Sequence, residues 1–201
     1  MKRPRSACLV LIALVAIAAC GGGPTITAKG LAAIMPSAAD APPGTTLQTD
    51  QSGPKTLDEF VAAEEVRAKL RSLGFKVGYV STFTTRNFPA DLTMAPYGTM
   101  LYGAFGVVFR DGEAAVSALA YYSTRARSRA KNPATVLSTA LGKDSFAFRF
   151  SSLEDTPLPG IVYFWRVGNA LFEVVGVGNP GPDGAAVRAL GRLIDSRAMK
   201  S

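Results

Sequence analysis

The stretch Ile161-Val-Tyr-Phe-Trp-Arg-Val-Gly-Asn-Ala-Leu-Phe-Glu-Val-Val-Gly-Val177 decides the fold, because two apolar runs flank the dipeptide Gly168-Asn169. A two-residue connection with glycine first fits a type II′ turn, whose backbone matches the twist of paired antiparallel strands. The β-branched and aromatic residues on both sides favour strands. The sequence therefore predicts a β-hairpin formed by Ile161 to Val167 and Ala170 to Val177.

Three further segments upstream of this hairpin have strand character. They are Phe75 to Thr85, Met100 to Arg110 and Ser145 to Phe150. In the first of them, Val77, Tyr79 and Phe83 share one parity, as in a half-buried strand. Met100 to Arg110 is apolar through nearly its whole length, which is typical of a central strand.

Helix start and stop signals separate these strands. Thr56-Leu-Asp-Glu59 matches a capping box and predicts a helix to about Ser72, with Gly74 as its stop. Asp111-Gly112 predicts a helix to about Arg129, and Asp183 a final helix to about Met199. We therefore expect an α+β fold: an antiparallel sheet of about five strands with two or three helices packed on one face, forming a single domain over residues 55–201.

The first twenty residues predict export and a membrane anchor. Lys2, Arg3 and Arg5 precede the apolar run Cys8 to Ala19, which is too short to span a bilayer as a helix. The tetrapeptide ending in Cys20, Ile-Ala-Ala-Cys, resembles the bacterial lipobox. This resemblance implies a signal peptide over residues 1–19 and a diacylglycerol, with fatty acyl chains such as palmitate, on the Cys20 thiol. The alternative is a secretory signal cleaved after Ala16-Ile17-Ala18, which would release a soluble protein.

Residues 20–54 are expected to join this anchor to the domain. Gly21 to about Lys29 begins Gly-Gly-Gly-Pro and is typical of a flexible tether. The short apolar stretch Leu31 to Met35 and the turn at Pro42-Pro43-Gly44 favour an ordered segment lying across the domain. The predicted location is the cell membrane or cell envelope, on the extracytoplasmic side, with the membrane as a partner through Cys20.

Composition excludes several kinds of chemistry. The chain has no histidine, and its two cysteines are Cys8 in the leader and Cys20. Serine-histidine triads and histidine-ligated zinc or haem sites are therefore excluded, and the domain can form no disulfide. Removing the three leader cations reduces the formal net charge from +7 to +4, which is typical of an ordinary solvated surface; attraction to anionic lipid headgroups or wall polymers is the alternative. Because the predicted location is outside the cell, we expect no nucleic-acid partner. We expect no cofactor, no metal site and no catalytic residue.

Several charged and aromatic residues have both a structural and a functional interpretation. Arg125, Arg127, Arg129 and Lys131 end a predicted helix, where cations complement the helix dipole; binding of phosphate or acidic glycan is the alternative. The available carboxylates are Glu59, Glu64, Glu65, Asp91, Asp111, Glu113, Asp144, Glu154, Asp155 and Glu173. Four aromatic residues at strand parity are expected to lie mostly in the core, with a binding surface as the alternative: Tyr79, Tyr102, Tyr163 and Trp165.

Glu173 stands out because it interrupts an apolar strand. A position on the outward, solvated face of the hairpin is the expectation. The alternative is a partly buried carboxylate paired with Arg166 across the turn.

One resemblance covers roughly Leu31 to Met199. Its elements are a strand ending in Phe109-Arg110, an Asp-Gly-x-Ala-Ala helix start, a strand from Asp144 to Phe150, and Tyr163-Phe-Trp-Arg-Val-Gly-Asn169 before a closing helix. Their order is similar to that in small envelope lipoproteins of high-GC bacteria and in extracytoplasmic sensor domains of actinobacterial serine/threonine kinases. The resemblance implies a shared fold more than a shared function.

The sequence is compatible with three functions. The leading one is a membrane-anchored extracytoplasmic lipoprotein that acts as a non-enzymatic envelope module and binds a ligand or a protein partner. The second is a lipid or glycolipid carrier, which requires a hydrophobic cavity between sheet and helices. The third is a carboxylate-based hydrolase, which requires two carboxylates facing each other across a cleft.

Overall fold

The computed structural model of the chain describes residues 23–136, 139, 141–153 and 156–201. The expected signal peptide, Cys20, Glu154 and Asp155 lie outside the described residues. Among the described residues, no helix combines the length and the apolar character needed to cross a bilayer.

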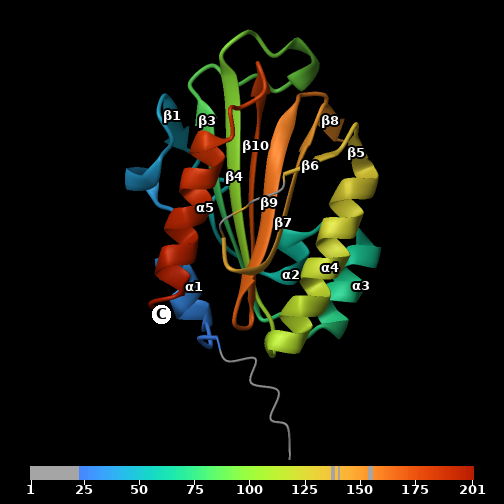
Figure 1. Ribbon diagram of the computed structural model, residues 1–201. Helices are drawn as coiled ribbons and strands as arrows, with labels where there is room; N and C mark the ends of the chain where they lie inside the picture. The colour runs from blue at the N-terminus through green and yellow to red at the C-terminus, as the bar shows by residue number, and fades with distance from the viewer. Residues whose placement is uncertain (1–22, 137–138, 140, 154–155) are drawn as a thin grey trace, which may run out of the picture.

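An antiparallel sheet of eight strands forms the centre of the molecule (Figure 1). Its long strands, in spatial order, are β3 (Val77–Thr85), β4 (Thr99–Val108), β10 (Ala170–Asn179), β9 (Gly160–Val167) and β7 (Lys143–Phe150). These are the strands expected from the sequence. The sheet is nevertheless larger than the expected five strands, because short strands extend its edges: β1 (Thr45–Leu47), β2 (Gly53–Lys55) and β6 (Ala134–Thr135). A separate pair consists of β5 (Ala130–Lys131) and β8 (Ser152–Leu153).

The central hairpin has the expected register. Ala170 lies opposite Val167, so Gly168 and Asn169 alone form the turn between β9 and β10. Gly168 has φ +55°, whereas Asn169 keeps a negative φ, the combination that a type II′ turn requires. Strand β10 also pairs with β4 along its whole length, from Ala170 opposite Val108 to Asn179 opposite Thr99. The hairpin is therefore at the centre of the sheet.

Helices cover both faces of the sheet, which corrects the expectation of a single covered face. Helices α1 (Ala28–Ile34) and α5 (Ala185–Ala198) lie on one face; α2 (Leu57–Phe60), α3 (Glu64–Ser72) and α4 (Gly112–Arg129) lie on the other (Figure 1). The physical reason is that β4, β9 and β10 are apolar at both parities, so both of their faces must be shielded from water.

The core is accordingly divided by the sheet into two layers. In the layer under α1 and α5, Trp165 stacks on Phe172 with ring centroids 5.6 Å apart, and Tyr102 and Tyr163 are buried. Tyr102, Tyr163 and Trp165 thus belong to the core, whereas Tyr79 is partly buried and packs against this layer. The layer under α3 and α4 contains Phe148, Phe164 and Leu171.

Local capping signals are confirmed, with two differences. Thr56 and Glu59 form the expected capping box, in which the Thr56 N–H donates to the Glu59 carboxylate at 2.8 Å. The expected single helix from 56 to 72 is divided into α2 and α3, because Val61 adopts an extended backbone (φ −139°) after the Phe60 ring packs against Gly78. The N-cap of α5 is Gly184, and the Asp183 carboxylate accepts from the Ala185 N–H at 2.8 Å.

The segment expected to be a tether is instead part of the fold from Gly23 onward. Ile26 is 2% exposed, and its backbone bonds to the side chain of Asn169 in the hairpin turn. Leu31 and Met35 pack against Gly106, where a side chain would leave them no room. The folded unit therefore begins near residue 23 rather than at 55, because these apolar side chains complete the core under α1 and α5.

Candidate functional site

Glu173 occupies a position in the middle of the sheet. In β10 it lies opposite Phe105 of β4 and Phe164 of β9, and it faces the layer that α2 and α4 cover. The residues at the same parity of β10 are Leu171, Val175 and Val177, which all belong to the apolar core of that layer. The Glu173 carboxylate is therefore a polar group placed among apolar side chains.

A cavity of about 180 Å³ adjoins this carboxylate. The sheet forms its floor, α2 and the residue after it form one wall, and α4 forms another. Its lining consists of Phe60, Val61, Phe105, Val107, Tyr122, Leu171 and Glu173, and is called the Glu173 cavity below. Apart from the Tyr122 hydroxyl and the Glu173 carboxylate, the lining side chains are apolar.

Both polar side chains of the cavity are electrostatically perturbed. Burial raises the pKa of Glu173 from its ordinary value of 4.5 to about 7, because the surrounding apolar groups disfavour its charged form. Burial also raises the pKa of Tyr122, and the nearby negative charge of Glu173 raises it further. The Tyr122 hydroxyl is buried and has no hydrogen-bond partner among the described residues. Such an unsatisfied group costs about 1–3 kcal/mol.

These features define what the cavity can hold. With a pKa near neutrality, Glu173 is present both as a neutral carboxylic acid that donates and as a carboxylate that accepts. The Tyr122 hydroxyl can donate or accept. Its volume is close to that of the engineered, enclosed cavity of about 150 Å³ that binds benzene in another protein, but the Glu173 cavity opens to solvent, since Phe60, Val61 and Phe105 are partly exposed. The cavity therefore suits a small, largely apolar molecule with one polar group directed at Tyr122 and Glu173.

The structure bears out each sequence interpretation of Glu173 only in part. Helices cover its face of the hairpin, and the Glu173 side chain is partly buried rather than fully solvated. It is not paired with Arg166, whose guanidinium instead forms an ion pair with Asp144 at 2.7 Å. Asp144 lies on β7, so the Arg166 guanidinium is directed to that strand and not to Glu173.

The arginines at the end of α4 do not form one anion site. Arg125 forms an ion pair with Glu65 of α3. Arg127 donates to the Thr135 hydroxyl at 2.8 Å and lies over the Phe146 ring. The side chains of Arg125 and Arg127 thus bind different neighbours rather than one shared anion.

The other carboxylates have mostly structural roles. Glu59, Asp91 and Asp111 cap helices, and Glu64 forms an ion pair with Arg67 at 2.7 Å. Hydrogen bonds from Thr56 lower the pKa of Glu59, and those from Thr93 lower the pKa of Asp91. Within the described part of the chain, no three acidic side chains gather as metal ligands would.

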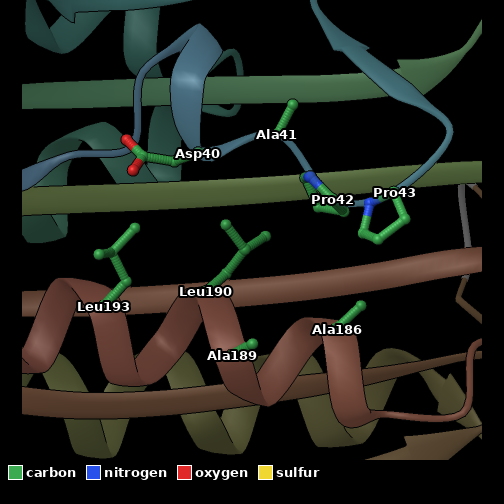
Figure 2. Close-up of a pocket in the computed structure, with 8 residues that line it drawn as sticks. All are labelled: Asp40, Ala41, Pro42, Pro43, Ala186, Ala189, Leu190 and Leu193. Carbon is green, nitrogen blue, oxygen red and sulfur yellow. The ribbon is translucent and has the colours of Figure 1, made fainter.

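A second hollow, the α5 groove, lies on the opposite face of the molecule. It has a volume of about 320 Å³ and separates the segment around Pro42-Pro43 from Ala189, Leu190 and Leu193 of α5 (Figure 2). Its charged residue, Asp40, is fully engaged with Arg197 and Ser37. Burial opposes ionisation of Asp40, but these hydrogen bonds outweigh it and lower its pKa. The α5 groove therefore offers no polar group that awaits a ligand.

Sequence reasoning singled out Glu173 but missed its neighbours. Tyr122 and Phe60 lie on predicted helices, and nothing in the helical pattern distinguishes them from other apolar positions. The signal that was available is parity: the strand around Glu173 is apolar at both parities, so it has no solvated face.

Comparisons with known proteins show a likeness of fold. No model of a known protein family matches the chain, and no curated protein matches it. The structure is similar to the crystal structure of the extracellular domain of PknH from Mycobacterium tuberculosis, with a TM-score of 0.56 and 10% sequence identity. The match covers 90% of this chain and 100% of that domain. At this identity the likeness shows the fold alone, and it agrees with the resemblance to extracytoplasmic domains.

Proposed function

We propose that this chain is a lipid-anchored extracytoplasmic module that binds a small, largely apolar molecule in the Glu173 cavity without converting it. The observation that carries the proposal is the buried Tyr122 hydroxyl, which lacks a partner among the described residues and lines the same cavity as a carboxyl of raised pKa. A bound molecule with a polar group would satisfy the hydroxyl. The lipobox-like motif at Cys20 supports the anchor.

The volume and the lining residues of the Glu173 cavity favour binding of a small molecule over a lipid carrier or a carboxylate-based hydrolase. A volume of about 180 Å³ suits a ligand of benzene-like size rather than the acyl chains of a glycolipid, so a lipid carrier is not supported. A glycosidase requires two carboxyl groups about 5–10 Å apart, whereas Glu173 is the single carboxylate in the cavity lining as described. We therefore assign binding rather than hydrolysis.

The binding proposal is tested by titrating the protein with benzyl alcohol and with hexylamine, followed by saturation-transfer NMR. Tyr122→Phe and Glu173→Gln each remove one polar contact and are expected to weaken binding of at least one probe about five- to tenfold, since one hydrogen bond contributes about 1 kcal/mol. Ala189→Phe, which fills the α5 groove, serves as the matched control and should leave binding unchanged. Binding that is equal in all variants, or no binding of either probe, would contradict the proposal.

The anchor is tested separately by intact mass. Protein extracted from the membranes of an expressing bacterium should begin at Cys20 and carry the mass of a diacylglycerol. An unmodified Cys20, or cleavage after Ala18, would show that the chain is secreted rather than anchored.

A further inference from the structure

We propose that the end of the sheet carrying the β9–β10 turn faces the lipid surface that holds Cys20, and that Lys29 and Lys76 lie against anionic headgroups there. This inference rests on the proposed lipid anchor. We call this end, marked by Gly168-Asn169 and by the first residue of β3, the turn end. The opposite end, where the Gly98 N–H donates to the Asn179 carbonyl at 2.6 Å, is the far end.

The distance between the anchor and the folded domain is short. Gly21 and Gly22 alone separate Cys20 from Gly23, the first described residue. A fully extended chain advances at most about 3.6 Å per residue, so the Cα atoms of Cys20 and Gly23 are no more than about 11 Å apart. The lipid-bearing residue therefore cannot move far from the place where Gly23 is seated.

Gly23 is seated on the hairpin turn itself. A side chain at Gly23 would meet the Gly168 backbone nitrogen at 2.9 Å, and one at Gly168 would overlap the Pro24 carbonyl. Two residues later, the Ile26 N–H donates to Asn169 Oδ1 at 2.7 Å, and Asn169 Nδ2 donates to the Ile26 carbonyl at 3.1 Å. These contacts fix the direction in which the chain leaves the domain, so the short linker brings the turn end to the membrane.

Charge at the turn end agrees with this orientation. Lys29 and Lys76 are exposed and form no ion pair with a described residue. Arg110 and Arg166 at the same end are neutralised by Asp111 and Asp144. Glu113, in the first turn of α4, offsets part of the remaining positive charge. A lysine within a Debye length of an anionic surface strengthens attachment about fivefold, so the two lysines add to the anchor and orient the domain on it.

The orientation also places the Glu173 cavity relative to the membrane. Glu173 is four residues along β10 from Asn169, which corresponds to about 13 Å at the rise of an antiparallel strand. Thr99, where β4 begins at the far end, is about 30 Å along that strand from Val108 at the turn end. The cavity therefore lies in the half of the domain nearer the lipid surface.

Single-cysteine labelling tests the orientation in the full lipidated chain. Once Cys8 is removed with the leader and Cys20 is acylated, an introduced cysteine is the single free thiol. Ser72→Cys places a fluorophore at the end of α3 beside the turn end, and Tyr97→Cys places it at the far end, where Tyr97 is 83% exposed. The proteins are reconstituted in phosphatidylcholine vesicles containing phosphatidylglycerol and a lipid with a nitroxide headgroup. We expect strong quenching at Ser72→Cys and little at Tyr97→Cys.

Two further variants test the roles of the short linker and of the two lysines separately. A long Gly-Ser insertion between Gly22 and Gly23 should remove the difference between the two labels. Replacing Lys29 and Lys76 by serine should reduce quenching at Ser72→Cys in vesicles with phosphatidylglycerol but not in pure phosphatidylcholine. An unchanged signal after the lysine replacements would overturn headgroup contact.

The failures of the anchor and of the orientation have different signatures. Protein that does not float with vesicles would overturn the anchor, and with it this inference. Protein that floats but shows equal quenching at both labels, or stronger quenching at Tyr97→Cys, would overturn the orientation while leaving the anchor intact.

Discussion

Asn169 holds the backbone of Ile26 through two hydrogen bonds that join residues 143 positions apart. The Ile26 N–H donates to Asn169 Oδ1 at 2.7 Å, and Asn169 Nδ2 donates to the Ile26 carbonyl at 3.1 Å. The same Nδ2 also donates to the Phe109 carbonyl at 3.1 Å. One turn side chain thus connects the N-terminal segment, the central hairpin and the end of β4.

Replacing Asn169 by alanine is expected to release the N-terminal segment. The change leaves backbone groups of Ile26 and Phe109 buried without these partners, and we expect it to lower the free energy of unfolding by about 3 kcal/mol. Urea denaturation measures the loss, and faster trypsin cleavage after Lys29 reports the released segment. Asn87→Ala, in an exposed turn, is the control and should change neither. Unchanged cleavage at Lys29 would show that the segment is held by other contacts.

Two glycine substitutions distinguish the stability lost to backbone strain from the stability lost to a steric clash with Pro24. Gly168 and Gly98 both have positive φ, +55° and +89°. A side chain at Gly98 would meet open space, whereas one at Gly168 would overlap the Pro24 carbonyl. Gly98→Ala should therefore cost about 1–2 kcal/mol of stability from backbone strain alone. Gly168→Ala should cost clearly more in the same urea titration. Equal losses would mean that Pro24 does not rest on the turn.

Local signals in the sequence predict the five long strands and the starts of α2, α4 and α5, but not α1, the short strands or the division between α2 and α3. The type II′ turn at Gly168-Asn169 and the capping box at Thr56 depend on neighbouring residues, and both form as expected. The stretch expected to be a tether, from Gly23 to Lys29, could not be predicted in this way, because its composition resembles a linker and the partner of Ile26 lies 143 residues away. The apolar stretch from Leu31 to Met35, in contrast, packs across the domain as expected. The predicted helices form as α2 and α3, α4 and α5. Their distribution over both faces was not predicted, although the central strands are apolar at both parities, which is the sign that both faces are covered.

The Glu173 carboxyl is expected to make stability depend on pH. Its folded-state pKa of about 7 exceeds its ordinary 4.5, so between these values the folded protein keeps a proton that the unfolded chain releases. Its contribution to stability is full below about pH 4.5 and is lost as the pH rises toward 7, by about 3 kcal/mol in all. Glu173→Gln has no carboxyl group at this position and does not show this loss. The free energy of unfolding of the variant, relative to that of the unmodified protein, should therefore increase as the pH rises from about 4.5 to 7.

Urea titrations of the two proteins at several pH values measure this difference. Asp50→Asn, at an exposed turn residue, controls for the general effect of removing a carboxylate. A difference between Glu173→Gln and the unmodified protein that stays constant with pH would show that Glu173 titrates as an ordinary surface group.

Tyr122→Phe is expected to raise stability in the absence of ligand while weakening binding. The hydroxyl is buried without a described partner, so its removal should add about 1 kcal/mol to the free energy of unfolding. Thermal and urea unfolding of the ligand-free protein measure the gain. Tyr97→Phe, at an 83% exposed position, should have no effect. Destabilisation by Tyr122→Phe would show that the hydroxyl is already satisfied in the free protein.

The candidate site was only partly accessible to sequence reasoning. Glu173 was conspicuous because it interrupts an apolar strand. Tyr122 and Phe60 come from separate helices, and nothing local to them indicates that they meet β10. The cavity exists because Val61 leaves the helical conformation after Phe60 packs on Gly78, a tertiary contact that overrides a continuous helical pattern.

The binding proposal is tested most directly by native mass spectrometry of the full lipidated protein, extracted in mild detergent from the membranes in which it was made. We compare the unmodified chain with Val61→Phe, which fills the Glu173 cavity, and Ala189→Phe, which fills the α5 groove. The account predicts a bound small molecule on the unmodified chain and on Ala189→Phe, and its loss from Val61→Phe. An unmodified chain that carries no small molecule, or one that Val61→Phe retains in full, would contradict it.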